Sequence, residues 1–229
     1  LKRDAEGQPI YGQRDEADMA VIASLGIPFW LAGGYGGHER LLEALATGAC
    51  GIQVGSTFAL TEESGMKAEY RTAIFKELRS GTDDAALVKT TIYSPTGFSF
   101  KVAQLEGTLS EDDVYEGRRR ICDIGLLQQR GFSKPDADGN RTLFQRCASA
   151  PVDSYLDHRG IERNTEERRC LCNGLLATIG LGQVKKINGE WTEEPAIVTL
   201  GNRLDGIRRL SRQGQTPYYV GDVLADILD

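Results

Sequence analysis

Two short apolar runs, each followed by glycine and separated by one helix, constrain the fold of this chain more than any other feature. The first run covers residues 28–32 (PFWLA), and the second covers residues 50–54 (CGIQV). Residues 38–47 (HERLLEALAT) lie between them, carry leucines on one helical face and end at Gly48. A strand, a helix and a strand at this short spacing predict parallel strands joined by a crossover helix. The start of the chain is therefore expected to belong to the α/β class.

The pattern of the chain changes near residue 80. Before this point we expect two further helices, and after it the segments are mostly short and rich in loops. The expected elements are helices at 15–25 and about 62–79, a helix over 111–121 capped by Ser110, a long loop at 131–148, a short helix from Pro151 to Gly160, a helix after an Asn164–Glu167 capping box, a turn at Asn188–Gly189, and helices near 203–212 and 220–228.

The glycines that follow both runs suggest an anion site. Bare glycine lets backbone N–H groups approach a phosphate, and a following helix N-terminus adds a favourable dipole. In (β/α)8 barrels, the loops after the last two strands form such a site. A Rossmann dinucleotide site competes, but Glu39 stands where the third glycine after Gly34 and Gly36 belongs, and no acid follows Val54–Gly55. The glycines also fit simple tight turns, so glycine content alone leaves both interpretations open.

Residues 27–65 (IPFWLAGGYGGHERLLEALATGACGIQVGSTFALTEESG) resemble the last two barrel strands of nitronate monooxygenases (2-nitropropane dioxygenases) and of related flavin enoyl reductases. In that family these strand ends hold the phosphate of FMN. The resemblance implies that the cofactor-binding residues here are Gly33, Gly34, Gln53, Gly55, Ser56 and Thr57, with Gln53 directed toward the barrel interior.

The resemblance extends beyond these strands. Residues 94–102 (SPTGFSFKV) and the segments around Cys122, Cys147 and residues 170–183 are similar to a subgroup of larger bacterial members. That subgroup resembles the trans-acting enoyl reductases of polyketide and polyunsaturated fatty acid synthesis. The implied fold is the C-terminal portion of a TIM (β/α)8 barrel followed by a mainly helical, loop-rich extension. Residues 1–80 would supply the last strands and helices of the FMN-binding barrel, and residues 81–229 the extension.

The function implied by the resemblance is that of an FMN-dependent oxidoreductase, a monooxygenase that oxidises alkyl nitronates or related small substrates with flavin and oxygen. The alternative is a flavin-dependent enoyl reductase in polyketide or fatty acid synthesis. An alternative of another class is a non-catalytic, metal-stapled fragment that completes a partner subunit. Flavin in the purified protein would favour the first two, and metal without flavin the third.

The family's catalytic histidine lies on an earlier barrel strand, in a Gly-Gly-His context, and is expected outside this chain. The expected partner is therefore the missing N-terminal part of the barrel, in the same or another chain. The chain opens at Leu1 in a polar loop, which suggests a fragment, a processed product or a subunit.

The two histidines and one aromatic-basic loop have competing interpretations. His38 follows the phosphate-binding strand, and it either contacts the phosphate or is a solvent-exposed residue at a helix start. His158 lies near an expected helix C-terminus and is interpreted as structural. Phe98, Phe100 and Lys101 either cover the flavin or hold an anionic nitronate or carboxylate, or else the phenylalanines pin the loop to the core.

Five cysteines are present, and four of them fall in the expected extension. Thiolates of Cys122, Cys147, Cys170 and Cys172 suit tetrahedral zinc or an iron–sulfur cluster, whereas small buried apolar side chains are the plainer interpretation. Cys50 lies on an expected barrel strand. The odd count and the lack of an export signal predict free thiols in a reducing, cytoplasmic compartment.

Charge and hydropathy exclude two classes of partner. The formal net charge is −6, which disfavours nucleic acid because phosphate backbones bind basic surfaces. No apolar run is long enough to span a bilayer, so no membrane association is expected.

Overall fold

The computed structural model describes residues 2–6 and 8–229. The chain is a mixed α/β protein that divides into two compact units. The first unit comprises Leu1–Thr90, Lys101–Leu105 and Thr199–Asp229, and the second comprises Thr91–Phe100 and Glu106–Val198. The boundary expected at residue 80 did not anticipate that residues 199–229 return to the first unit.

The first unit contains the expected parallel pair of strands. Strand β3 (Trp30–Ala32) pairs with β4 (Gly51–Gln53), in the register Trp30↔Gly51 to Ala32↔Gln53, and α2 (His38–Ala46) connects them. The prediction of parallel strands with a crossover helix is confirmed. The described residues form only small, two-stranded sheets and no closed barrel, so the barrel itself stays a prediction.

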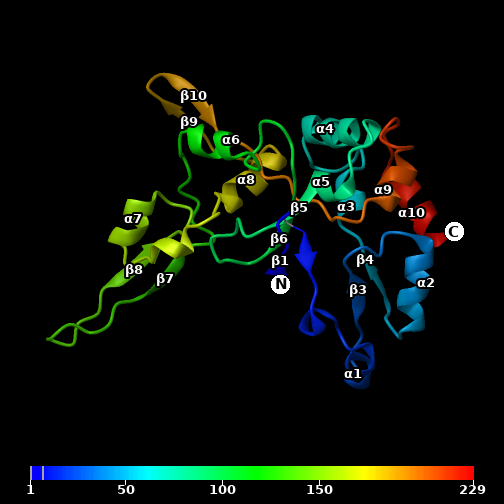
Figure 1. Ribbon diagram of the computed structural model, residues 1–229, viewed down its shortest axis with the longest axis horizontal. Helices are drawn as coiled ribbons and strands as arrows, with labels where there is room; N and C mark the ends of the chain where they lie inside the picture. Colours follow the sequence, from blue (N-terminus) through cyan, green and yellow to red (C-terminus); the bar gives the residue numbers. More distant parts are fainter. Residues whose placement is uncertain (1, 7) are drawn as a thin grey trace. The chain divides into compact units, whose positions relative to one another are not determined.

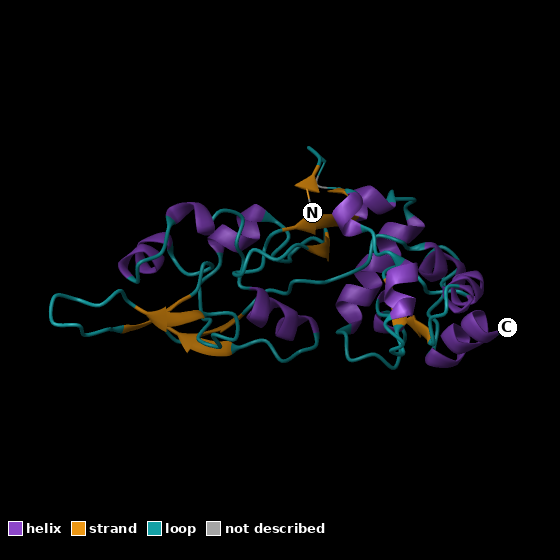
Figure 2. Ribbon diagram, turned by 90° about the horizontal axis from the view of Figure 1, so that it is seen from below, coloured by secondary structure: helices purple, strands orange, loops and turns teal. Residues whose placement is uncertain are grey.

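Short helices accompany these strands in the first unit (Figure 1). Helix α1 (Met19–Ser24) is shorter than the helix expected at 15–25. It starts after Asp18, whose carboxylate accepts hydrogen bonds from the N–H groups of Ala20 and Val21 at 3.0 and 3.1 Å. The other elements are β1 (Lys2–Arg3), β2 (Pro9–Ile10), a 3-10 turn at Gln13–Asp15, α1 (Met19–Ser24), α3 (Ser56–Ala59), α4 (Ala68–Arg79), α5 (Asp84–Leu87), α9 (Asp205–Leu210) and α10 (Val220–Leu228). In Figure 2, helices of this unit surround the short strands near the C-terminus.

The last thirty residues complete the core of the first unit. Tyr218 is 1% exposed, and its ring lies 6.0 Å from that of Phe75 on α4. Its hydroxyl donates to the Thr57 carbonyl at 2.8 Å. Leu204 and Ile207 are also buried, around the start of α9. Burial of these side chains, rather than helix propensity, holds the short α3 and α9 in place.

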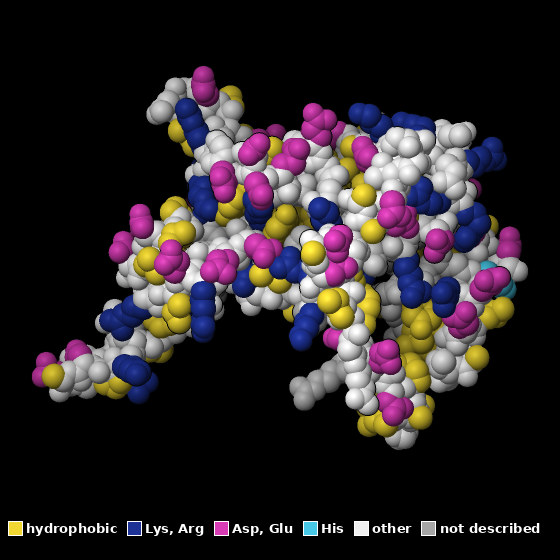
Figure 3. Space-filling view, viewed as in Figure 1, with side chains coloured by type: hydrophobic (Ala, Val, Ile, Leu, Met, Phe, Trp, Pro, Cys, Tyr) yellow, Lys and Arg dark blue, Asp and Glu magenta, His cyan; other side chains and the backbone are white. Residues whose placement is uncertain are grey.

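One surface of the first unit is unusually apolar. The side chains of Ile27 and Trp30 are 66% and 59% exposed. The other exposed large apolar residues of α1, its C-terminal loop and α2 are Val21, Leu25, Leu42 and Leu45. Figure 3 shows hydrophobic side chains over the region of α1, β3 and α2. We call these six residues the apolar patch.

The second unit is built from hairpins and short helices. Its core contains Leu109, Tyr155 and Ile197, all almost fully buried. The elements are α6 (Asp112–Gly117), β7 (Gln129–Phe132), β8 (Leu143–Arg146), α7 (Val152–Asp157), a 3-10 turn at Glu162–Asn164, α8 (Leu171–Thr178), β9 (Val184–Ile187) and β10 (Glu190–Glu193). The chain passes between the two units in strands β5 (Val88–Thr91) and β6 (Phe100–Ala103), which form a two-stranded sheet.

Three expectations for the second unit are wrong. Residues 131–148 are not one long loop, because β7 and β8 pair in an antiparallel hairpin of four-residue strands on which the apolar Phe132 and Leu143 are exposed. Helix α6 starts after Glu111 and ends at Gly117, and the Ser110 hydroxyl bonds Thr108 instead of capping. Helix α8 starts at Leu171, after Cys170, rather than at the expected capping box.

Other local expectations are confirmed. Asn188 and Gly189 have φ values of 51° and 90° and join β9 to β10 in a tight hairpin. Pro151 precedes α7, and α9 and α10 lie within the two ranges expected at the end of the chain.

Candidate functional site

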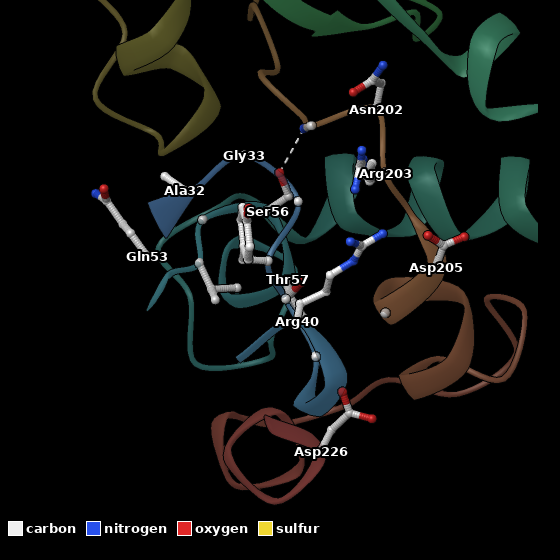
Figure 4. Close-up of a pocket in the computed structure, with 18 of the residues that line it drawn as sticks. Ala32, Gly33, Arg40, Gln53, Ser56, Thr57, Asn202, Arg203, Asp205 and Asp226 are labelled. Carbon is white, nitrogen blue, oxygen red and sulfur yellow. Dashed lines mark hydrogen bonds between the residues drawn. The ribbon is translucent and has the colours of Figure 1, made fainter. Parts of the chain in front are cut away.

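A cavity of about 850 Å³ lies at the glycine-containing ends of β3 and β4, within the first unit. The loops after both strands, the starts of α2 and α3, and residues 201–209 line it (Figure 4). All six residues expected to bind the cofactor are among its lining residues: Gly33, Gly34, Gln53, Gly55, Ser56 and Thr57. The structure thus brings together residues that the sequence places on two separate turns.

Glycine is required at the end of β3 for two reasons. Gly33 and Gly34 have φ values of 88° and 98°, which strain any residue with a Cβ. A Cβ at Gly34 would also lie 2.4 Å from Cδ of Arg203. At Gly33 and Gly55, by contrast, a Cβ would meet nothing within 4 Å. Bare backbone therefore faces open space at both strand ends.

Two helices begin at this cavity. Gly37 is the N-cap of α2 and Gly55 is the N-cap of α3. The first N–H groups of a helix have no partner within it, and the helix dipole favours an anion at that end. The cavity therefore offers backbone donors to a negatively charged ligand.

Arg203 supplies the positive charge with the fewest competing contacts. It lines the cavity, and its aliphatic stem packs against Gly34. Among the residues that the structure describes, its guanidinium has no hydrogen bond or ion pair. A guanidinium presents several donors in a fixed fork that matches phosphate oxygens.

The other cations of the cavity already have partners. Arg209 donates to both carboxylate oxygens of Asp226 at 2.6 and 2.5 Å. Arg40 donates to Glu43 at 2.6 Å, and this ion pair raises the pKa of the Arg40 guanidinium. Lys101 donates to the Asn202 side chain at 2.6 Å. These three cations still add positive potential to the cavity, but the guanidinium of Arg203 is the group that is free to bind an anionic ligand.

Ser56 and Thr57 also have structural roles. The Ser56 hydroxyl accepts a hydrogen bond from the N–H of Gly201 at 2.7 Å, which ties the loop after β4 to residues 201–203. Its own proton remains able to donate to an anion. Thr57 is buried and its carbonyl is held by Tyr218. In Figure 4 the Gln53 amide is directed away from Ser56.

The remaining candidates lie in different settings. His38 lines the cavity, and its Nδ1 lies 3.2 Å from the Ile227 carbonyl. His158 ends α7 and its Nδ1 contacts the Ser154 carbonyl at 2.7 Å, as expected for a structural histidine. Phe98 is 74% exposed, whereas the Phe100 ring packs edge-on against Tyr93. Phe98 is therefore not pinned to a core.

The sequence interpretation missed Arg203 and the Gly201–Asn202 turn beside it. No local pattern marks these residues, because a single arginine in a polar loop is common on any surface. Only the return of residues 199–229 to the first unit brings them to the glycine turns.

The four cysteines of the second unit line one further cavity, of about 120 Å³. The Cys170 thiol donates a hydrogen bond to the Cys122 sulfur, which lowers the pKa of Cys122 to about 6. That same hydrogen bond and burial raise the pKa of Cys170. Within residues 2–6 and 8–229, no three His, Cys, Asp or Glu side chains converge closely enough to surround a single ion.

Comparisons with protein-family models, curated proteins and solved structures returned no match to this chain. None of the described helices has the length and apolar character needed to cross a membrane.

Proposed function

We propose that the cavity of the first unit binds the phosphate of FMN, and that this chain belongs to an FMN-dependent oxidoreductase of the nitronate monooxygenase type. One observation carries the proposal. Two parallel strands open through glycine turns onto one cavity, where the guanidinium of Arg203 lies beside Gly34 without a protein partner.

The lining of the cavity fits a phosphate monoester. The backbone at Gly33 and Gly55 is bare, α2 and α3 begin at residues that line the cavity, and Ser56 retains a hydroxyl donor. Lys101 and Arg209 also line the cavity and add positive potential. A carboxylate ligand would use fewer of these donors than a phosphate with three terminal oxygens.

Bound FMN would supply electron transfer between a small substrate and oxygen. The residues of this chain would hold its phosphate end and thereby fix the position of the flavin ring. We expect an alkyl nitronate as the substrate, in line with the resemblance of residues 27–65. The proton-handling histidine is expected on another part of the barrel, and His38, held against Ile227, is not assigned that role.

The proposal includes a TIM barrel completed by further strands. A pair of parallel strands is not stable alone, since parallel sheets are normally covered on both faces. The apolar patch, with Trp30 and Ile27 more than half exposed, is the surface that neighbouring barrel strands and helices would cover. We propose that the N-terminal part of the barrel, in the same or another chain, is this partner.

The test compares FMN with riboflavin, which lacks the phosphate, on the intact purified assembly. We expect flavin absorbance, FMN released on denaturation, and a higher affinity for FMN than for riboflavin. Arg203→Gln should weaken FMN binding roughly 10- to 100-fold, the loss of a charge-assisted hydrogen bond pair, and leave riboflavin binding unchanged. Arg212→Gln, an exposed residue outside the cavity, is the matched control.

Equal affinity for FMN and riboflavin, or no flavin binding by the intact assembly, would contradict the proposal. Activity assays then separate the two flavin reactions. Oxygen-dependent loss of an alkyl nitronate supports the monooxygenase, and reduction of an enoyl thioester by a reduced nicotinamide supports the enoyl reductase.

A non-catalytic function is the second candidate, because the second unit gathers four cysteines at one cavity. A chain that binds metal but never flavin, in any assembly, would support this candidate.

A further inference from the structure

The second unit collects four cysteines from three separate segments of the chain. Cys122 lies between α6 and β7, and Cys147 directly follows β8. Cys170 and Cys172 lie at the start of α8. All four line the same cavity, although up to 50 residues separate them in the sequence. Their gathering at one cavity is a consequence of the tertiary fold and not of sequence proximity.

One cationic side chain is directed at these sulfurs. The Arg118 guanidinium donates to the Cys170 sulfur at 2.8 Å. Donors directed at sulfur stabilise thiolate charge, which is the form that binds metals.

The surrounding charges suit a site with excess negative charge. Four thiolates around a divalent ion or an iron–sulfur core leave a net negative centre. Arg118 is nearly buried beside Cys170, and Arg120 lines the cavity itself, as does the oppositely charged Asp123. Arg118 is also anchored by Glu194 at 3.0 Å, which fixes its orientation. The fold therefore holds one cation rigidly against the sulfurs.

We propose that Cys122, Cys147, Cys170 and Cys172 form a four-thiolate metal centre. It is independent of the FMN site, since every residue of this cavity belongs to the second unit. Zinc and an iron–sulfur cluster share this ligand chemistry. The sulfurs line a cavity of about 120 Å³, and among the described residues no three of them surround a single point, so binding of either group requires the thiols to close in.

A metal centre at this place would stabilise the second unit. The second unit consists of hairpins with four-residue strands and of α-helices with six to eight residues, so it has few long elements to supply a core. A centre that joins the segment after α6, the end of β8 and the start of α8 would cross-link three segments that are distant in the sequence. Metal binding free energy then contributes directly to folding.

The experiment measures zinc, iron and acid-labile sulfide in the full chain, purified without oxygen after expression with both metals supplied. We expect about one centre per chain, as zinc alone or as iron with matching sulfide. Cys147→Ser and Cys172→Ser should each lower metal content at least roughly tenfold. Cys50→Ser is the matched control, because Cys50 is exposed in the first unit and should leave metal content unchanged.

A thiol titration of the wild-type protein tests the proposal without any variant, so its result does not depend on whether the variants fold. In the native protein we expect Cys50 to react with a thiol reagent and Cys122 to be protected, although Cys122 is exposed in the structure. A chelator should expose the additional thiols and release the metal at the same time. Absence of both metals, a metal content equal in Cys147→Ser and wild type, or a Cys122 that reacts as fast as Cys50 would each overturn the proposal.

Discussion

The hydrogen bond between Tyr218 and Thr57 links the end of the chain to a residue that lines the cavity of the first unit, and its removal tests this part of the fold. Tyr218→Phe keeps the buried ring and its contact with Phe75 but removes the hydroxyl that donates to the Thr57 carbonyl at 2.8 Å. Tyr218 is 1% exposed, so water does not readily replace the lost donor. A buried acceptor without its partner costs about 1–3 kcal/mol, so we expect the free energy of unfolding to fall by about 2 kcal/mol.

The two tryptophans of the chain make the assay specific for each unit. Trp30 belongs to the first unit and Trp191 to the second. In a Trp191→Phe background, urea unfolding followed by tryptophan fluorescence reports on the first unit alone. We expect Tyr218→Phe to lower the transition midpoint without a change in slope, as for a pure stability change.

Tyr219→Phe is the matched control, because this neighbouring tyrosine is 52% exposed. Its effect should stay within about 0.5 kcal/mol, the usual range for exposed substitutions. A loss of less than about 0.5 kcal/mol in Tyr218→Phe, equal to the control, would show that the hydroxyl does not support the Thr57 carbonyl. The argument that residues 199–229 hold the cavity together would then be refuted.

Three further predictions follow from buried groups. Burial raises the pKa of Tyr218, so the folded state keeps the hydroxyl proton at pH values where the unfolded chain loses it. The stability that Tyr218 contributes should therefore be complete below the ordinary tyrosine pKa of about 10 and decrease above it. In Tyr218→Phe, the urea midpoint should lack this part of the decrease at alkaline pH. Gly174→Ala should destabilise the second unit by about 1–3 kcal/mol despite better helix propensity, because a Cβ would lie 2.8 Å from Cγ1 of Ile197; a more stable protein in thermal unfolding would contradict this. Arg118→Met should cost about 3–5 kcal/mol because it leaves Glu194 buried without its cation, and the addition of Glu194→Gln should recover part of that loss in urea unfolding; no recovery would mean that the charge of Glu194 is not the cause.

Part of the candidate site was predictable from local sequence. Glycines after two apolar runs, with an apolar-faced helix between them, predicted the parallel strands and an anion site at their ends. The six cofactor-binding residues were implied by the resemblance of residues 27–65, and all six are among the residues that line the cavity. These features are local, since a strand end, a helix start and a left-handed glycine each depend on a few neighbouring residues. The hairpin at β7 and β8 was missed because each strand has only four residues and its apolar side chains do not mark a buried face, since Phe132 and Leu143 are both exposed.

The sequence by itself determined where the backbone turns and where it is bare enough to approach an anion. It did not determine which distant side chains complete that cavity, or which thiols face one another. Arg203 reaches Gly34, and Tyr218 reaches Thr57, only because the last thirty residues return to the first unit and bury Leu204 and Ile207 there. Burial of apolar surface depends on the whole assembly of elements and not on any one segment, so only the tertiary structure decided these contacts.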